Sequence, residues 1–146
     1  MTDSPFRVRL ASWPQDEPRL KAIRHQVFVI EQQVPEDLEW DGIDAGCRHV
    51  LAEDRAGAPI GCGRLLPDGH IGRMAVLRDW RGKGVGAALL DYLVELALEQ
   101  GFYRVVLNAQ VRAMPFYARH GFTRCGAEFE EAGIVHCAMD RLLRAA

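Results

Sequence analysis

The feature that most constrains the fold of this chain is a glycine-rich turn between two apolar runs. Gly82, Gly84 and Gly86 alternate with Arg81, Lys83 and Val85, and the apolar residues 74–77 and 87–90 flank them. Without Cβ atoms the turn can adopt left-handed dihedral angles and bring its N–H groups close to an anion. A helix that starts there adds its free N–H groups and its dipole. The sequence therefore predicts a phosphate cradle between a strand and a helix; a glycine-rich connection that binds nothing is the alternative.

Spacing separates this turn from two common nucleotide-binding motifs. In a P-loop the Gly-Lys pair is followed by a Ser or Thr that holds magnesium, whereas Lys83 is followed by Gly84. The dinucleotide fingerprint needs a third glycine three residues after the second, and Ala87 stands at that position. A nucleotide-binding regulator is therefore disfavoured.

Composition is that of one globular domain, residues 1–146. The chain is 49% hydrophobic and 26% charged, and no apolar run approaches the roughly 18 residues that span a bilayer. The first residues lack the pattern of a secretion signal, so we expect a cytoplasmic protein that does not contact the membrane. A net charge of −2 without a basic block disfavours nucleic acid as a partner. The four cysteines have no C-x-x-C spacing, so we expect no metal site and no redox pair.

Residues 32–46 form an acidic stretch with no clear periodicity. Asp37, Glu39 and Asp41 have the first spacings of an EF-hand loop, but Arg48 stands where the bidentate glutamate must be, which excludes that calcium site. The stretch is either solvated surface or a loop that faces the substrate and attracts a cationic amine.

Hydrophobic periodicity gives the order of the remaining elements. It predicts a strand at 6–13, an amphipathic helix at 19–31, strands at 48–54, 59–66 and 70–77, a helix from the glycine turn to residue 100, a strand at 104–109, a short helix within 110–122, and strands at 123–129 and 134–141. The strand, helix and strand around the turn imply a right-handed parallel crossover, with the turn at the carboxyl end where open sheets bind ligands. We expect an α/β fold, with a central, mixed and mostly antiparallel sheet flanked by helices.

Two motifs give the chain a family resemblance. Arg81, Gly84 and Gly86 match the R/Q-x-x-G-x-G/A signature of the GNAT acetyltransferases, and the chain resembles that family again in Ala113, Phe116-Tyr117 and Gly121-Phe122. Residues 27–35, Asp41, Asp44, His49 and the Phe-Tyr pair are similar to the ElaA-like branch. The sequence departs from the usual pattern at Gln110, where the family often has Asn, and at Val135 before His136, where the branch tends to have Pro.

The resemblance implies an enzyme that moves an acetyl group from acetyl-CoA to a primary amine. It places the cofactor's pyrophosphate on the turn from Gly82 to Gly86 and its pantetheine along Met74, Ala75 and Val76, with Gln110 and Phe116 beside it. It makes Tyr117 the proton donor to the departing thiol. For the general base the favoured residue is His70, on the strand that enters the turn, with Glu31 and His49 as rivals.

The acceptor is expected to be a small cationic amine. If the acidic stretch lines the mouth of the site, six carboxylates surround the entering substrate: Glu31, Glu36, Asp37, Glu39, Asp41 and Asp44. Glu31, Asp41, Asp44 and His49 are the candidate substrate contacts. A monomer or homodimer is expected, and a non-catalytic acyl-CoA-binding or regulatory module with the same fold is the alternative function.

Overall fold

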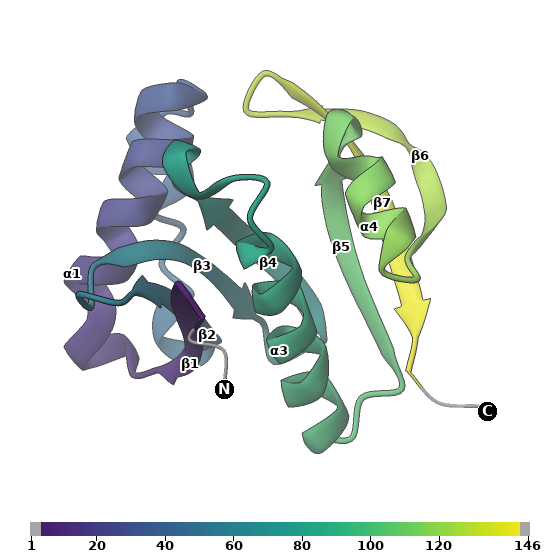
Figure 1. The fold of residues 1–146 in the computed structure, drawn as a ribbon. Helices are drawn as coiled ribbons and strands as arrows, with labels where there is room; N and C mark the ends of the chain where they lie inside the picture. The colour runs from purple at the N-terminus through teal and green to yellow at the C-terminus, as the bar shows by residue number, and fades with distance from the viewer. Residues whose placement is uncertain (1–3, 144–146) are drawn as a thin grey trace.

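Seven strands form one sheet in the order β1-β2-β3-β4-β5-β7-β6 within residues 4–143, the part of the chain that the computed structural model describes (Figure 1). The strands are β1 (Phe6–Ala11), β2 (Arg48–Asp54), β3 (Pro59–Leu65), β4 (His70–Val76), β5 (Arg104–Gln110), β6 (Thr123–Glu131) and β7 (Ile134–Leu142). Neighbouring strands are antiparallel except β4 and β5, which are parallel. The expected mixed and mostly antiparallel α/β fold is confirmed.

Helix α3 (Val85–Glu99) packs on one face of the sheet. Its apolar side chains, among them Leu89 and Leu93, are fully buried against Val50 of β2 and Leu107 of β5. The short helix α4 (Met114–Arg119) lies on the same face and packs its Phe116 and Tyr117 against this core. An almost entirely apolar helix such as α3 is stable only with most of its surface covered, which fixes it against the sheet.

Helix α1 (Trp13–Arg24) and the π-helix η1 (His25–Glu31) cover the opposite face, against Leu51, Cys62 and Ala75. The sequence prediction was wrong about the start of this helix, which it placed at residue 19. β1 ends at Ala11 and the helix begins at Trp13, since a proline is tolerated in the first turn and Asp16 accepts the backbone N–H of Ser12 at 2.9 Å.

The acidic stretch is more regular than predicted. It contains α2 (Glu36–Glu39) and the 3-10 turn η2 (Asp44–Gly46); two further 3-10 turns are η3 (Arg78–Trp80) and η4 (Val111–Ala113). Among the described residues, no helix has the length and apolar character needed to cross a membrane.

The sheet opens between its two parallel strands. β4 pairs with β5 only through His70 with Val106 and Ile71 with Leu107, and in Figure 1 the two strands then diverge. β4 carries a bulge against β3 beyond these pairs: Cys62 faces Ala75 while Arg64 faces Gly72, so β4 has one residue more than β3 in between. The bulge directs the end of β4 away from β5, and a cleft lies between the two.

Candidate functional site

The predicted phosphate cradle lies between β4 and α3. Gly82 has φ of +75° and Gly84, the N-cap of α3, has φ of +88°, and a Cβ added at either would meet no atom within 4 Å. The first hydrogen bond of the helix runs from the N–H of Ala88 to the carbonyl of Gly84, so the preceding N–H groups of the first turn make no helical bond. The turn is thus open, and within residues 4–143 the N–H groups of the first turn of α3 remain without a helical partner, an arrangement that suits an anion.

Gly86 has a different role from the other two glycines. A Cβ at this position would lie 3.5 Å from the Phe116 ring and 3.9 Å from Cγ2 of Val76. Both distances are ordinary van der Waals contacts, so Gly86 lies against side chains of α4 and β4, whereas Gly82 and Gly84 face open space.

The two cations of the turn are used differently. Arg81 donates from Nε to the carbonyl of Val76 at 2.9 Å and pairs through both terminal nitrogens with Glu31 at 3.0 Å, so it braces the turn against β4 and η1. The Lys83 ammonium lies 5.3 Å from the centre of the Trp80 ring, and no carboxylate of the described residues pairs with it. Lys83 is the cation that remains available to an anion.

A cleft of about 590 Å³ occupies the gap between β4 and β5. Its walls come from the segment after η1, from β4 and from the β5, β7 and α4 side. The polar or sulfur-bearing residues of the lining are Gln32, Glu39, Asp41, Arg64, Asp68, His70, Arg73, Met74, Asn108, Gln110, Tyr117, Glu131 and His136. Gln110 donates to Oε1 of Gln32 at 2.8 Å, a bond that joins the end of β5 to the segment after η1.

Tyr117 points its hydroxyl into the cleft. The hydroxyl lies 3.9 Å from Sδ of Met74, and the ring packs edge-on against Phe116 and Phe122. Burial raises the pKa of Tyr117 to about 12, so the phenol keeps its proton throughout the physiological range.

His70 also lines the cleft, beside Asp68. Its Nδ1 lies 3.0 Å from Oδ1 of Asp68, and its backbone N–H donates to the same oxygen at 3.1 Å. Nδ1 is buried and makes no hydrogen bond within the described residues, so Asp68 lies near the ring without fixing its tautomer.

His136 is a cleft residue that the sequence reasoning did not count as functional. Its Nδ1 donates to the carbonyl of Ile134 at 2.7 Å, which leaves Nε2 as the acceptor, and its ring stacks on Phe129. The register places it opposite Gln110 on β5, so both side chains share the cleft face. The register of β5 and β7 places His136 in the cleft, and a local sequence pattern does not predict that register.

Of the four residues predicted to contact substrate, only Asp41 lines the cleft. His49 is buried, stacks on Trp13 at 4.7 Å and donates from Nε2 to the carbonyl of Asp44 at 2.8 Å; burial lowers its pKa, so it is neutral. Asp44 is buried as well. Glu31 is paired with Arg81 at the turn.

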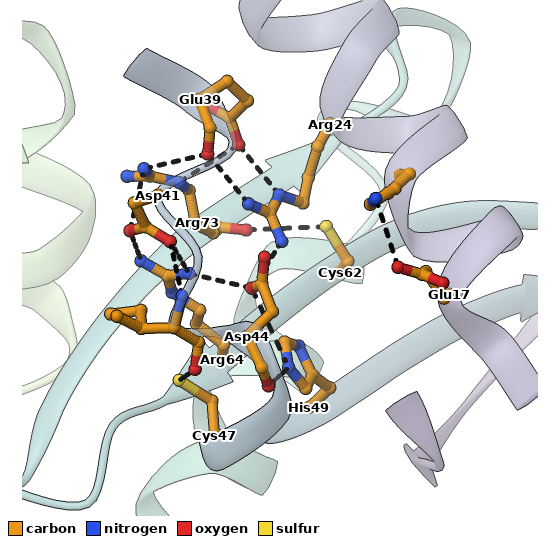
Figure 2. Close-up of polar contacts among 12 residues, drawn as sticks. Glu17, Arg24, Glu39, Asp41, Asp44, Cys47, His49, Cys62, Arg64 and Arg73 are labelled. Atoms are coloured by element: carbon orange, nitrogen blue, oxygen red, sulfur yellow. Dashed lines mark hydrogen bonds and ion pairs between the residues drawn. The ribbon is translucent and has the colours of Figure 1, made fainter. Parts of the chain in front are cut away.

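A cluster of three arginines and three carboxylates explains these positions (Figure 2). Arg24, Arg64 and Arg73 hold Glu39, Asp41 and Asp44, with contacts of 2.5–3.2 Å. Burial disfavours the ionised form of Asp41, but hydrogen bonding to Arg64 outweighs that effect and lowers its pKa to about 2. The charges of the cluster cancel.

The acidic stretch therefore does not present the field of six carboxylates that the sequence suggested. Three of them belong to the neutral cluster and Glu31 is paired with Arg81, because arginines 15 or more residues away in sequence fold against them. Asp68 and Glu131, two carboxylates from other parts of the chain, line the cleft without an arginine partner among the described residues.

The molecule is an α/β domain whose sheet opens between two parallel strands, with an open glycine turn at the start of α3. Residues 15–143 match the acetyltransferase (GNAT) domain, and the chain belongs to the GNAT acetyltransferase family. The predicted resemblance is confirmed, and the protein is an acetyltransferase.

Individual relatives agree with this assignment. The chain is 37% identical over 121 residues to the uncharacterized N-acetyltransferase YjcF of Bacillus subtilis, covering 80% of this chain and 86% of the relative. Two crystal structures, an acyl-CoA N-acyltransferase from Pseudomonas aeruginosa and Escherichia coli ElaA, superpose with TM-scores of 0.83 and 0.82. Each is 28% identical to this chain, and each match covers 93% of this chain and 99% of the other.

Proposed function

We propose that this protein is an acetyl-CoA-dependent N-acetyltransferase that transfers the acetyl group directly to a primary amine of a small acceptor. The observation that carries the proposal is the open glycine turn at the start of α3, beside a cleft that contains the Tyr117 hydroxyl. The named activity of the Pseudomonas relative supports an acyl-CoA donor, and that of YjcF supports transfer to nitrogen.

The residues present fit coenzyme A. The space where Gly82 and Gly84 would carry a Cβ is free, and the first-turn N–H groups of α3 and the Lys83 ammonium are available to the pyrophosphate. Met74, Ala75 and Val76 follow the last pair that β4 makes with β5, and Met74 lines the cleft. We propose that the pantetheine arm would run along this end of β4. Gln110 lines the same cleft, so it would lie beside this arm. Phe116 packs beside Gly86 and Tyr117 and is not among the residues that line the cleft. The bound cofactor supplies an acetyl group activated as a thioester.

Tyr117 holds the proton that the departing sulfur needs. With a pKa of about 12 the phenol is a weak acid, so its proton moves only as negative charge develops on the acceptor atom. Until then the hydroxyl serves as a hydrogen-bond donor in a partly dry cleft, where such a bond is stronger than in water.

The base must take a proton from the incoming amine. Among the three residues considered from the sequence, Glu31 is paired with Arg81, and His49 is buried with Nε2 engaged. His70 remains: it lines the cleft, and its Nδ1 lies 3.0 Å from Oδ1 of Asp68. We assign the base to His70, and its rival is His136, whose tautomer is set by the Ile134 carbonyl.

The charge of the acceptor follows from the carboxylates that lack arginine partners. Asp68 and Glu131 line the cleft, while Asp41 there is neutralised by Arg64 and Arg73. A small cationic amine is the acceptor we propose, selected by these two residues rather than by the acidic stretch as a whole.

Two measurements test the proposed function. Thermal shift with acetyl-CoA, NADH and ATP should show stabilisation by acetyl-CoA alone. Release of free thiol is then followed with a panel of polyamines, aminoglycosides, amino acids and peptides, and the product is identified by mass. Failure of acetyl-CoA to stabilise the protein would refute the proposal, and stabilisation without acetylation of any amine would favour the non-catalytic binding module.

A further inference from the structure

Arg73 occupies a backbone position that an arginine seldom takes. It lies in the bulge of β4 with φ of +49°, whereas residues with a Cβ generally avoid the left-handed region. Gly72, which would adopt this conformation without cost, is its immediate neighbour. Since the chain places an arginine here, the contacts of that side chain must compensate for the unfavourable dihedral.

The guanidinium of Arg73 makes those contacts with the segment from Leu38 to Asp41. Nε lies 3.0 Å from Oε2 of Glu39, and Nη2 lies 3.2 Å from Oδ2 of Asp41. Nη2 also lies within hydrogen-bond distance of the carbonyls of Leu38 and Glu39, at 3.3 and 3.2 Å. The planar, multiply donating head of arginine suits such a set of acceptors better than a lysine would.

The partners of Arg73 are themselves fixed. Glu39 is 2% exposed and also accepts from Arg24 at 2.8 Å, and Asp41 is held by Arg64 at 2.5 Å (Figure 2). The Arg73 carbonyl, on the other side of the bulge, accepts from Sγ of Cys62 on β3 at 3.5 Å. The Arg73 side chain is thus fixed to the cluster of arginines and carboxylates, and its backbone adopts the left-handed conformation of the bulge.

The turned main chain determines what borders the cleft. Met74, Ala75 and Val76 follow Arg73 directly, and within residues 4–143 β4 forms no pair with β5 beyond Ile71. Met74, the first of the three, lines the cleft. A different φ at residue 73 would rotate the peptide groups of these three residues relative to the cleft.

We infer that Arg73 is a positioning residue for the acyl donor. Its ion pairs with Glu39 and Asp41 hold the left-handed bulge that orients the backbone of residues 74–76 toward the pantetheine arm. This inference rests on the proposed function, because it takes that backbone as the binding edge for acetyl-CoA.

Two substitutions separate the backbone effect from the loss of the ion pairs. Arg73→Ala and Arg73→Gly both remove the ion pairs, but only glycine adopts a positive φ freely. Both variants should lose similar thermal stability. The Kd for acetyl-CoA by calorimetry should rise about tenfold in Arg73→Ala and stay within about threefold of the unsubstituted protein in Arg73→Gly. With a working amine assay, the loss in Arg73→Ala should appear in KM for acetyl-CoA and leave kcat nearly unchanged.

Arg104→Ala is the matched control, because Arg104 also forms an arginine–carboxylate pair on a strand, with Asp140 at 2.9 Å, but lies outside the cleft and the bulge. Its Kd should not change. If Arg73→Ala does not fold, Arg73→Lys replaces it, since lysine keeps the Cβ and cannot reproduce the planar contacts. An unchanged Kd in the Cβ-bearing variant, or equal weakening in that variant and Arg73→Gly, would overturn the inference.

A measurement without ligand keeps the inference separate from the proposed function. The amide resonances of Met74, Ala75 and Val76 should shift in Arg73→Ala and remain near their original positions in Arg73→Gly. If the unsubstituted protein does not bind acetyl-CoA, the proposed function fails. The amide resonances still decide whether Arg73 sets this backbone: unshifted resonances in Arg73→Ala would refute that role.

Discussion

A negative charge at Gly84 should remove acetyl-CoA binding while leaving the fold in place. Gly84 is the N-cap of α3 with φ of +88°, and a Cβ there meets no atom within 4 Å, so a side chain costs left-handed strain but no clash. That strain is roughly 1–2 kcal/mol for an ordinary residue and smaller for Asn and Asp, which enter this region more readily. An acidic side chain at a helix start recovers roughly 0.3–1 kcal/mol through the helix dipole.

Gly84→Asp and Gly84→Asn therefore form a pair of nearly equal size and backbone preference that differ in charge. A carboxylate about 4 Å from a phosphate charge is repelled by about 1 kcal/mol in bulk water and about 4 kcal/mol at the effective dielectric constant of a protein surface. A repulsion energy of about 2 kcal/mol, between these two limits, corresponds to a Kd for acetyl-CoA about 30-fold higher in the Asp variant than in the Asn variant. The free energies of unfolding of the two variants should differ by no more than about 1 kcal/mol.

Isothermal titration calorimetry at low and at physiological salt measures the Kd of each variant for acetyl-CoA. The difference between the two variants should shrink as salt screens the repulsion over a Debye length of about 8 Å. A Kd for Gly84→Asp within about twofold of that for Gly84→Asn would show that no phosphate lies beside this residue. The assignment of the glycine turn as the pyrophosphate site would then be wrong.

Three further predictions concern the chemistry, the acceptor and the acid stability. Tyr117→Phe should keep the Kd for acetyl-CoA and lower kcat about 10²-fold or more, and an unchanged kcat would contradict the proton-donor role. Glu131→Gln should raise KM for a cationic amine and reduce its salt dependence, whereas Glu130→Gln, the neighbour on β6 that does not line the cleft, should change neither; equal effects would show that Glu131 does not select the acceptor. Hydrogen bonding to Arg9 lowers the pKa of Asp16 from 3.8 to about 2, so its contribution of roughly 2 kcal/mol is present above pH 4 and is lost as the pH falls toward 2. Urea unfolding at pH 7 and pH 2 should therefore show a smaller difference in the free energy of unfolding for Asp16→Asn than for the unsubstituted protein, and an equal difference would contradict the assignment.

The sequence by itself determined the parts of the fold that depend on local patterns. Alternation and helical periodicity predicted the seven strands and the long helix, and the glycines at 82 and 84 predicted a left-handed turn at a helix start. These features depend on dihedral preferences and on which face of a single element is apolar, and both are encoded within a few neighbouring residues. The family resemblance rests on two such local motifs, so it too was readable from the chain.

Tertiary structure alone decided which charges remain available at the site. The acidic stretch looks like an exposed negative loop, but Arg24, Arg64 and Arg73 come from α1, β3 and β4 and cancel three of its carboxylates. His49, a plausible base on sequence grounds, became a buried neutral residue, whereas His136 reached the cleft through the register of β5 and β7. The physical reason is that an ion pair or a cleft wall joins residues tens of positions apart, so its formation depends on strand order and register, which no local pattern specifies.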